Sequence, residues 1–290
     1  VIALTAYFLV TPLVDSSASQ LFYNHNPNVL IFFLVALALG LVGLAEDFNF
    51  EINPKVRMAA QFMIGILTCI YFPELFPISI DFFFFSDYLN NERFILLSSI
   101  LVFVGFVNAG NIVDGANGLL SLSLACLFLV AYTLTFDAVY WALFLAVFVF
   151  ALVNIFQGKI FLGDFGAYFL SGLAVLIAFN LYNLNKVTIW MLASFLSYPC
   201  LELSRIMLSR LFSKSSPFLA DDSHYHNYLH EILRNVVSSS LAANSLTGLT
   251  ISFTFAVIPL VIYLANFLDP LGHGWFVVFI LQSIWFFASY

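Results

Sequence analysis

The chain has 290 residues, of which 62% are hydrophobic and only 9% are charged. Soluble domains are roughly 45 to 50% apolar, so this composition excludes an ordinary soluble domain and predicts an integral membrane protein. The net charge of −7 comes from acids spread over many short loops, and we expect no nucleic-acid partner. Three cysteines, Cys69, Cys126 and Cys200, show neither a disulfide framework nor metal-ligand spacing.

Apolar runs dominate the sequence. A membrane-spanning helix needs about 20 residues, and about ten runs are long enough or nearly so. These runs lie near 1–13, 29–45, 58–72, 94–107, 119–136, 138–155, 166–181, 188–204, 246–266 and 275–290. We therefore expect an all-α, polytopic membrane protein forming one domain over residues 1–290. Because the chain starts at Val1 inside an apolar run, we also expect that an upstream segment is missing.

Lysine and arginine are unevenly shared between the two sides of these spans. Numbered from the first span, the odd loops hold only Arg93 and Lys186, whereas the even loops hold Lys55, Arg57, Lys159, Arg205, Arg210, Lys214 and Arg234. Positive residues are retained on the cytoplasmic side, so we expect the even loops to be cytoplasmic. The same loops carry the concentrated polar groups, which predicts a site on that face.

The first polar segment reads GLAEDFNFEINPKVRMAAQ. It places the adjacent acids Glu46 and Asp47 at the end of one span, with Lys55 and Arg57 at the start of the next. Adjacent carboxylates repel unless a proton or a cation lies between them. The segment is therefore either part of a cation-dependent site or a charged hairpin that anchors two helices.

The second segment, NAGNIVDGANGLL, combines short amides, one carboxylate and glycines. Asn108, Asn111, Asp114 and Asn117 recur every three residues, so all four could line one face if the helix continued through them. The alternative is a flexible turn, since Asn and Gly are common turn residues. The period of three favours a site.

The third segment, GKIFLGDFGAYFLSG, places Asp164 between two glycines at the entry to a span. This acid either caps the helix or binds a hard cation such as Mg²⁺, which takes one or two carboxylates together with substrate phosphates.

The fourth segment, SRLFSKSSPFLADDSHYHNYLHEIL, is the most polar part of the chain. His224 and His226 follow Arg210 and Lys214, and these cations and imidazoles could contact phosphates. A solvated amphipathic loop remains the alternative. Zinc is less favoured, because no carboxylate or thiol completes a zinc pattern.

In this order, the four segments resemble the polyprenyl-phosphate N-acetylhexosamine-1-phosphate transferase family (glycosyltransferase family 4). The branch with an undecaprenyl-phosphate acceptor and a UDP-N-acetylglucosamine-like donor is the most similar. Glu46 and Asp47 match the family's Asp-Asp pair. The Asn-Ala-x-Asn-x-x-Asp-Gly-x-Asp-Gly-Leu pattern matches residues 108–119, with Asn117 at the second Asp. Phe-x-Gly-Asp-x-Gly-Ser matches residues 161–167, and Asp-x-x-His-x-His-His matches residues 221–227.

The resemblance implies transfer of an N-acetylhexosamine 1-phosphate from a UDP-sugar to undecaprenyl phosphate, with release of UMP. It implies Mg²⁺, with Mn²⁺ as a substitute, held by Asp164 and Asp114, and a catalytic role for Asp47 as base or acceptor-side group. The other residues that it implies in substrate binding are Glu46, Lys55, Arg57, Asn108, Asn111, Asn117, Phe161, Arg210, Lys214, His224 and His226.

The resemblance further implies about eleven spans in full-length members and a bacterial inner-membrane location with a cytoplasmic site. No span singles out a dimer face, so the oligomeric state is open, with a homodimer as one possible assembly. Two alternatives remain. Because Glu46 and Asn117 replace aspartates, the chain could be a catalytically impaired lipid-phosphate-binding paralogue. A polytopic transporter would instead place its acids near mid-span within an inverted repeat, whereas these acids lie at span ends.

Overall fold

The secondary structure of the described residues is entirely helical, as expected. The computed structural model describes residues 28–48, 52–83, 86–213 and 223–290. The elements in chain order are α3 (Val29–Asp47), α4 (Pro54–Tyr71), η1 (Pro73–Leu75), α5 (Ser86–Leu89), α6 (Glu92–Val113), α7 (Leu119–Thr135), α8 (Ala138–Gln157), α9 (Gly163–Asn183), α10 (Ile189–Phe195), α11 (Ser197–Ser213), α12 (Tyr225–Val236), α13 (Ser240–Ser252), η3 (Phe253–Val257), α14 (Ile258–Leu264) and α15 (Gly274–Ser289).

Five helical stretches among the described residues are long and apolar enough to cross a membrane. They are α3, α6, α8, α9 and the continuous stretch Ser240–Leu264. Helices α7 and α15 are apolar but shorter. Large apolar side chains such as Ile70, Leu97 and Ile284 are more than half exposed, which is tolerated against lipid. The chain is therefore a polytopic membrane protein, and the expected span 1–13 lies outside the described residues.

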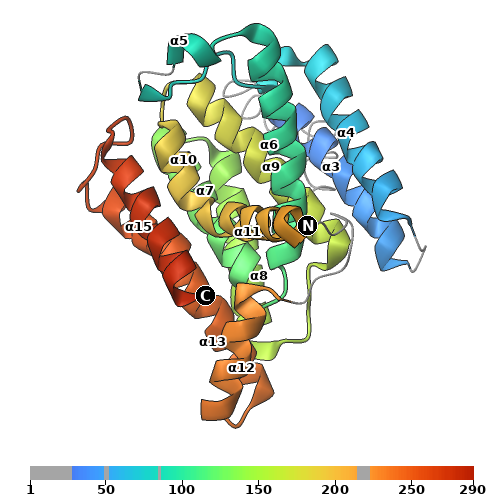
Figure 1. Cartoon of the computed structure of the whole chain (residues 1–290), viewed down its shortest axis with the longest axis vertical. Helices are drawn as coiled ribbons and strands as arrows, with labels where there is room; N and C mark the ends of the chain where they lie inside the picture. The colour runs from blue at the N-terminus through green and yellow to red at the C-terminus, as the bar shows by residue number, and fades with distance from the viewer. Residues whose placement is uncertain (1–27, 49–51, 84–85, 214–222) are drawn as a thin grey trace.

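Helix α9 is the centre of the bundle (Figure 1). Of its most apolar 18-residue window, 83% is buried, against 39 to 50% for the other four stretches. It packs against α3, α6 and α7. At its N-terminal end α3 comes very close, because a Cβ on Gly43 would overlap the backbone of Asp164. Glycine is needed at this crossing, so the acids that end α3 lie beside the start of α9.

The expected span 188–204 is wrong as a single helix. It is divided into α10 and α11, with the break at Leu196, and Figure 1 shows α11 turned across the bundle. Pro199 explains the break, since its nitrogen cannot donate to the carbonyl of Phe195 and its ring clashes with that carbonyl. The break directs α11 toward the segment that carries the histidines.

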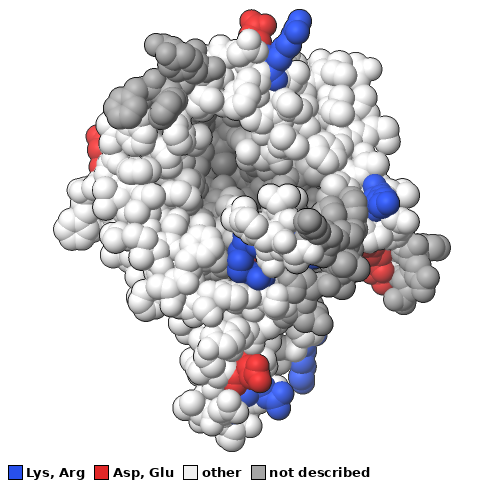
Figure 2. Space-filling view, viewed as in Figure 1, with Lys and Arg blue, Asp and Glu red and all other residues white. Residues whose placement is uncertain are grey.

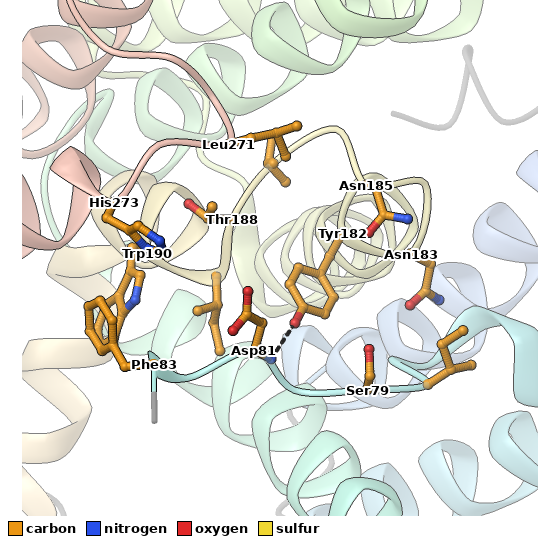
Figure 3. A pocket seen from close by; sticks show the side chains of 13 residues that line it. Ser79, Asp81, Phe83, Tyr182, Asn183, Asn185, Thr188, Trp190, Leu271 and His273 are labelled. Carbon is orange, nitrogen blue, oxygen red and sulfur yellow. Dashed lines mark hydrogen bonds between the residues drawn. The ribbon is translucent and has the colours of Figure 1, made fainter. Parts of the chain in front are cut away.

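On the face drawn in Figure 2, most charged side chains lie near the rim. Figure 2 shows one face that is largely uncharged, with small charged groups around its rim, beneath α11 and near α12. A cavity of about 460 Å³ lies at the C-terminal end of α9 and is lined by residues such as Asp81, Tyr182 and Trp190 (Figure 3). It is therefore at the opposite end of α9 from Asp164.

Candidate active site

Acids from three separate segments meet at the N-terminal end of α9. Asp164 is in the first turn of α9. It lies within electrostatic reach of Glu46 and Asp47, the last two residues of α3, and of Asp114, which follows α6. Carboxylates gathered in this way need a compensating cation or proton. The convergence is what a site for a cation and phosphates requires.

Asp47 caps α9 from a different helix. Its Oδ1 accepts a hydrogen bond from the backbone N–H of Asp164 at 2.9 Å, and its Oδ2 accepts one from Phe165 at 3.0 Å. The residue that would normally cap α9 is Leu162, whose side chain cannot accept a hydrogen bond. Gly163 lies against the Asp47 carboxylate with a φ of +64°, a conformation that favours glycine. Asp47 therefore fixes the backbone that carries Asp164.

Glu46 is paired with a cation. Its two carboxylate oxygens accept hydrogen bonds from Nη1 of Arg57 at 2.7 and 2.6 Å. The guanidinium carbon of Arg57 is also 5.9 Å from the centre of the Tyr168 ring, a cation–π distance. Glu46 thus holds the positive charge of α4 beside the acids of α3 and α9.

Asp114 follows the last residue of α6 and is held in a desolvated position. Burial, with a further contribution from the negative charge of Asp164, raises the pKa of Asp114 to about 8. At neutral pH this carboxyl group is protonated unless a cation offsets the two charges. Upstream on α6, Asn108 donates to the Gln61 side chain of α4 at 2.6 Å, and Asn111 donates to the Tyr168 hydroxyl at 3.4 Å.

The expected stripe of four polar residues includes only the first three. Helix α6 ends at Val113 with Asp114 as its C-cap residue, so Asn117, three residues further on, leaves that face. Its backbone N–H donates to Asn244 at 2.6 Å and its amide nitrogen donates to Ser245 at 3.2 Å. The loop is tied down at Gly118 as well, whose N–H donates to Asn154 at 2.6 Å. The structure thus gives Asn117 a role in anchoring the Asp114 loop to α13.

The histidine segment packs directly on the Asp114 loop. A Cβ on Gly115 would overlap Nε2 of His226. Nδ1 of His226 is 3.2 Å from the hydroxyl of Tyr198, and its ring stacks on His224 with centroids 5.3 Å apart. Burial and the neighbouring His224 lower the pKa of His226 to about 4. His226 is therefore a neutral imidazole packed against Gly115, the residue that follows Asp114.

A small cavity of about 60 Å³ opens beside these groups. Asp114, Asn117 and Phe161 line it together with Asn244. The Phe161 side chain is 67% exposed, which leaves its ring available for stacking against a planar group. Three residues expected at the site therefore share one cavity.

The acids fit a hard cation only if a substrate contributes to its binding. Among the described residues, no group of three or more His, Cys, Asp or Glu is arranged to hold a metal ion by itself. Mg²⁺ typically takes one or two carboxylates and completes its shell with substrate phosphates and water. Asp114 and Asp164, which repel one another, supply donors of this kind.

Comparison with known proteins assigns the chain to a family. Residues 29–182, which carry the first three polar segments and more than half of the chain, match the family described as Glycosyl transferase family 4. The chain belongs to this family. Its members are polyprenyl-phosphate hexosamine-1-phosphate transferases, which confirms the resemblance inferred from the four segments.

Two relatives illustrate the range within the glycosyl transferase family 4. An undecaprenyl-phosphate alpha-N-acetylglucosaminyl 1-phosphate transferase from Thermotoga maritima is 29% identical over 245 residues, 81% of this chain and 74% of that protein. A phospho-N-acetylmuramoyl-pentapeptide-transferase from Streptococcus pneumoniae is 26% identical over 201 residues, 61% of this chain. The matched region spans 58% of the pneumococcal protein's length.

Three further residues were expected at the site, namely Lys55, Arg210 and Lys214. Lys55 is exposed in the first turn of α4. Arg210 is in the last turn of α11, and Lys214 lies outside the described residues. Their proposed contacts with phosphate stay predictions.

The structure also reveals residues that sequence reasoning missed. Glu202 is fully buried in α11. Its Oε1 accepts hydrogen bonds from Arg205 at 2.8 and 3.2 Å and is 3.2 Å from Nδ1 of His224, and its Oε2 accepts one from the Tyr225 N–H at 3.3 Å. Glu202 therefore holds the histidine segment in place. An isolated acid inside the expected span 188–204 was the available signal.

Proposed function

We propose that this chain transfers an N-acetylhexosamine 1-phosphate from a UDP-sugar to undecaprenyl phosphate and so initiates cell-envelope polysaccharide synthesis. The observation that carries this proposal is the meeting of Asp47, Asp114 and Asp164 at one end of α9. The family membership supports the reaction class. The named activity of the Thermotoga maritima relative supports the acceptor and the sugar class.

The proposed reaction is a phosphoryl transfer at the sugar-linked phosphorus. An oxygen of the lipid phosphate attacks this phosphorus, and the bond from it to the bridging oxygen breaks. The bridging oxygen leaves with UMP, and a lipid diphosphate sugar remains. Since the nucleophile is already an anion, the protein has chiefly to position the two substrates and offset their charges.

Asp114 and Asp164 would hold Mg²⁺, or Mn²⁺ in its place, at this end of α9. The cation would offset the negative charge of the donor diphosphate. Asp47 belongs to the acceptor side by resemblance, and its two hydrogen bonds to α9 keep Asp164 in position. Arg57, held by Glu46, would supply a fixed positive charge for a phosphate.

The donor nucleotide is proposed to lie along the small cavity beside Asp114. Phe161 would stack on uracil, and Asn117 would contact the nucleotide from the cavity wall. Asn108 and Asn111 would orient the groups around the cation. His224 and His226, with Arg210, Lys214 and Lys55 from the flanking segments, would contact the diphosphate or sugar.

The distribution of Lys and Arg supports a site that faces the cytoplasm, and the bacterial relatives support a location in a bacterial inner membrane. A UDP-sugar is water-soluble, whereas a polyprenyl phosphate lies in the bilayer with its phosphate at the interface. A site at helix ends is where the two substrates can meet.

The test is a panel of UDP-sugars supplied to the purified full-length protein with undecaprenyl phosphate. We expect Mg²⁺-dependent release of UMP with at least one UDP-N-acetylhexosamine. If every donor is inert, and the double substitution Glu46→Asp with Asn117→Asp restores turnover, the chain is an impaired paralogue instead. Solute flux in proteoliposomes without UMP release would identify a transporter.

A further inference from the structure

The cavity at the C-terminal end of α9 is assembled from three connecting segments (Figure 3). The backbone N–H of Asp81 donates to the Tyr182 hydroxyl at 2.8 Å. The side chain of Asn183 donates to the carbonyl of Phe76 at 2.9 Å. The N–H of Thr188 donates to the carbonyl of Pro270 at 3.0 Å. These bonds join segments far apart in the sequence, so the cavity is preformed.

The size and lining of this cavity are those of a small-molecule site. Its volume of about 460 Å³ lies within the range of roughly 300 to 1,000 Å³ found for ligand pockets. Figure 3 shows polar side chains from all three segments around one space, including Ser79, Asn185 and His273. Phe83 and Trp190 form an aromatic wall.

One group in the lining needs a hydrogen-bond donor. The amide nitrogen of Asn183 donates to the carbonyls of Glu74 and Phe76. Its buried Oδ1 has no hydrogen-bond partner among the described residues. An unsatisfied buried acceptor is costly, so the wall of the cavity contains one unpaired polar atom.

The charges of the lining exclude several classes of ligand. No Lys or Arg is among the described residues that line the cavity, and Asp81 is the one acid there. A phosphate or carboxylate ligand would therefore be repelled and left without a cation. A divalent cation would find only a single carboxylate. An acyl chain would desolvate the amides and hydroxyls of the wall.

A quaternary ammonium ligand is also disfavoured. Such ligands need open aromatic faces. Here Trp190 and Phe83 stack on each other with centroids 5.3 Å apart, and Trp190 meets Phe276 edge-on at 4.6 Å. The aromatic rings therefore contact one another rather than forming an open cage.

We propose that this cavity binds an uncharged, hydroxyl-rich ligand of the size of a monosaccharide or disaccharide. Hydroxyl groups both donate and accept, so they match a wall that offers Asp81 as an acceptor and Asn185 and Thr188 in either role. The ligand is either a free saccharide or the headgroup of a glycolipid. The proposal goes beyond the transfer reaction, because this cavity is at the other end of α9.

The test is ligand-observed saturation-transfer NMR on the full-length protein in phosphatidylcholine nanodiscs, with methyl β-D-glucopyranoside as the probe. We expect saturable transfer to the sugar ring protons at millimolar concentration. Asp81→Asn and Asn185→Gly should each weaken binding by about fivefold, the effect of one lost hydrogen bond. Glycine is chosen because Asn185 has a φ of +50°.

Asn266→Gly is the matched control. Asn266 also follows a helix, is exposed and has a positive φ of 55°, but it does not line the cavity. This variant should bind the sugar like the wild type. Displacement of the probe by a glucosyl diacylglycerol in the nanodisc would assign the site to a glycolipid headgroup, and its retention would assign it to a soluble saccharide.

The proposal is overturned if the sugar shows no saturable transfer, or if all three variants bind it equally. It is also overturned if choline or glycerol phosphate binds as tightly as the sugar. Because the experiment contains neither UDP-sugar nor lipid phosphate, its outcome is independent of the proposed transferase function.

Discussion

The two ends of α9 differ in chemistry although they belong to one buried helix. At the N-terminal end, the carboxylate of Asp47 accepts two backbone N–H groups, and Asp164 lies in the first turn. At the C-terminal end, Asn183 donates its neutral amide to two backbone carbonyls, and the adjoining cavity has one acid in its described lining.

The arrangement at the N-terminal end follows from the polarity of the helix. Free N–H groups and the positive end of the helix dipole stabilise carboxylates at the start of a helix. At the other end, the carbonyls that Asn183 binds belong to the segment after α4. A central helix therefore fixes where acids can be gathered for phosphate and cation chemistry. Cavity size is a poor guide to the position of the active site in this protein, because the larger of these two cavities lies at the end of α9 without the acid cluster.

If the N-terminal end of α9 is the active site, the largest loss of activity is expected on replacing Asp164. Asp164→Asn should lower kcat/KM for UMP release by at least about 100-fold, as expected when a preorganised charged group at a phosphoryl-transfer site is removed. The matched control is Glu92→Gln, an exposed acid at the first turn of α6. Retained activity in Asp164→Asn would remove this residue from the site.

A second prediction concerns pH and the histidine segment. Burial and the charge of His224 hold the pKa of His226 at about 4, against 6.5 for a free histidine, while the buried Glu202 acts in the opposite direction. Above pH 6.5 both folded and unfolded chains carry a neutral imidazole. As pH falls toward 4 only the unfolded chain gains the proton, so stability of the order of 3 kcal/mol is lost over that window.

The measurement is the thermal unfolding midpoint between pH 7.5 and pH 4 in detergent. His226→Gln should remove this part of the slope, whereas His273→Gln, an exposed histidine at the cavity end, should retain it. Equal slopes in all three proteins would show that His226 is not held neutral by burial.

A third prediction uses two glycines near the C-terminal half of α6. A Cβ at Gly115 would overlap His226, whereas a Cβ at Gly105 would meet its nearest neighbour, Leu203, at an ordinary 3.7 Å. Gly115→Ala should therefore displace the histidine from the Asp114 loop and lower kcat/KM by at least about tenfold. Gly105→Ala should stabilise the helix by about 1 kcal/mol. Full activity in Gly115→Ala would contradict the packing described.

The smallest expected effect is on stability, and it distinguishes the capping role of an aspartate from a catalytic role. Asp47 caps α9, and Asp137 caps α8 by accepting from the Val139 N–H at 2.9 Å. Replacing either with Ala should cost about 1 kcal/mol of stability, the usual effect of losing a cap. Thermal unfolding and UMP release, measured together, should show that only Asp47→Ala also loses activity. Activity lost equally in both variants would indicate a general effect of destabilisation.

The sequence predicted the helical class, the span containing α9 and the gathering of four polar segments, since these depend on local composition and on the family resemblance. It could not predict the cap on α9, because that contact joins Asp47 to residues 117 and 118 positions away. It missed the role of Glu202, which looks like a lone acid in an apolar run. The sequence also predicted that the polar stripe of α6 continues to Asn117. This was wrong because Asn117 forms hydrogen bonds to α13, and the spacing of polar residues does not reveal such long-range contacts.

The central claim is that Asp114 and Asp164, fifty residues apart, act as one unit. The most direct test is a double-mutant cycle on kcat/KM for UMP release with Asp114→Asn, Asp164→Asn and the combined variant. If the two acids share one cation and one diphosphate, their effects on kcat/KM should not be additive, since groups that act as a unit are not additive. The double variant should then be about as impaired as the more impaired of the two single variants. Losses that multiply would show that the two acids work independently and would contradict a shared site at the N-terminal end of α9.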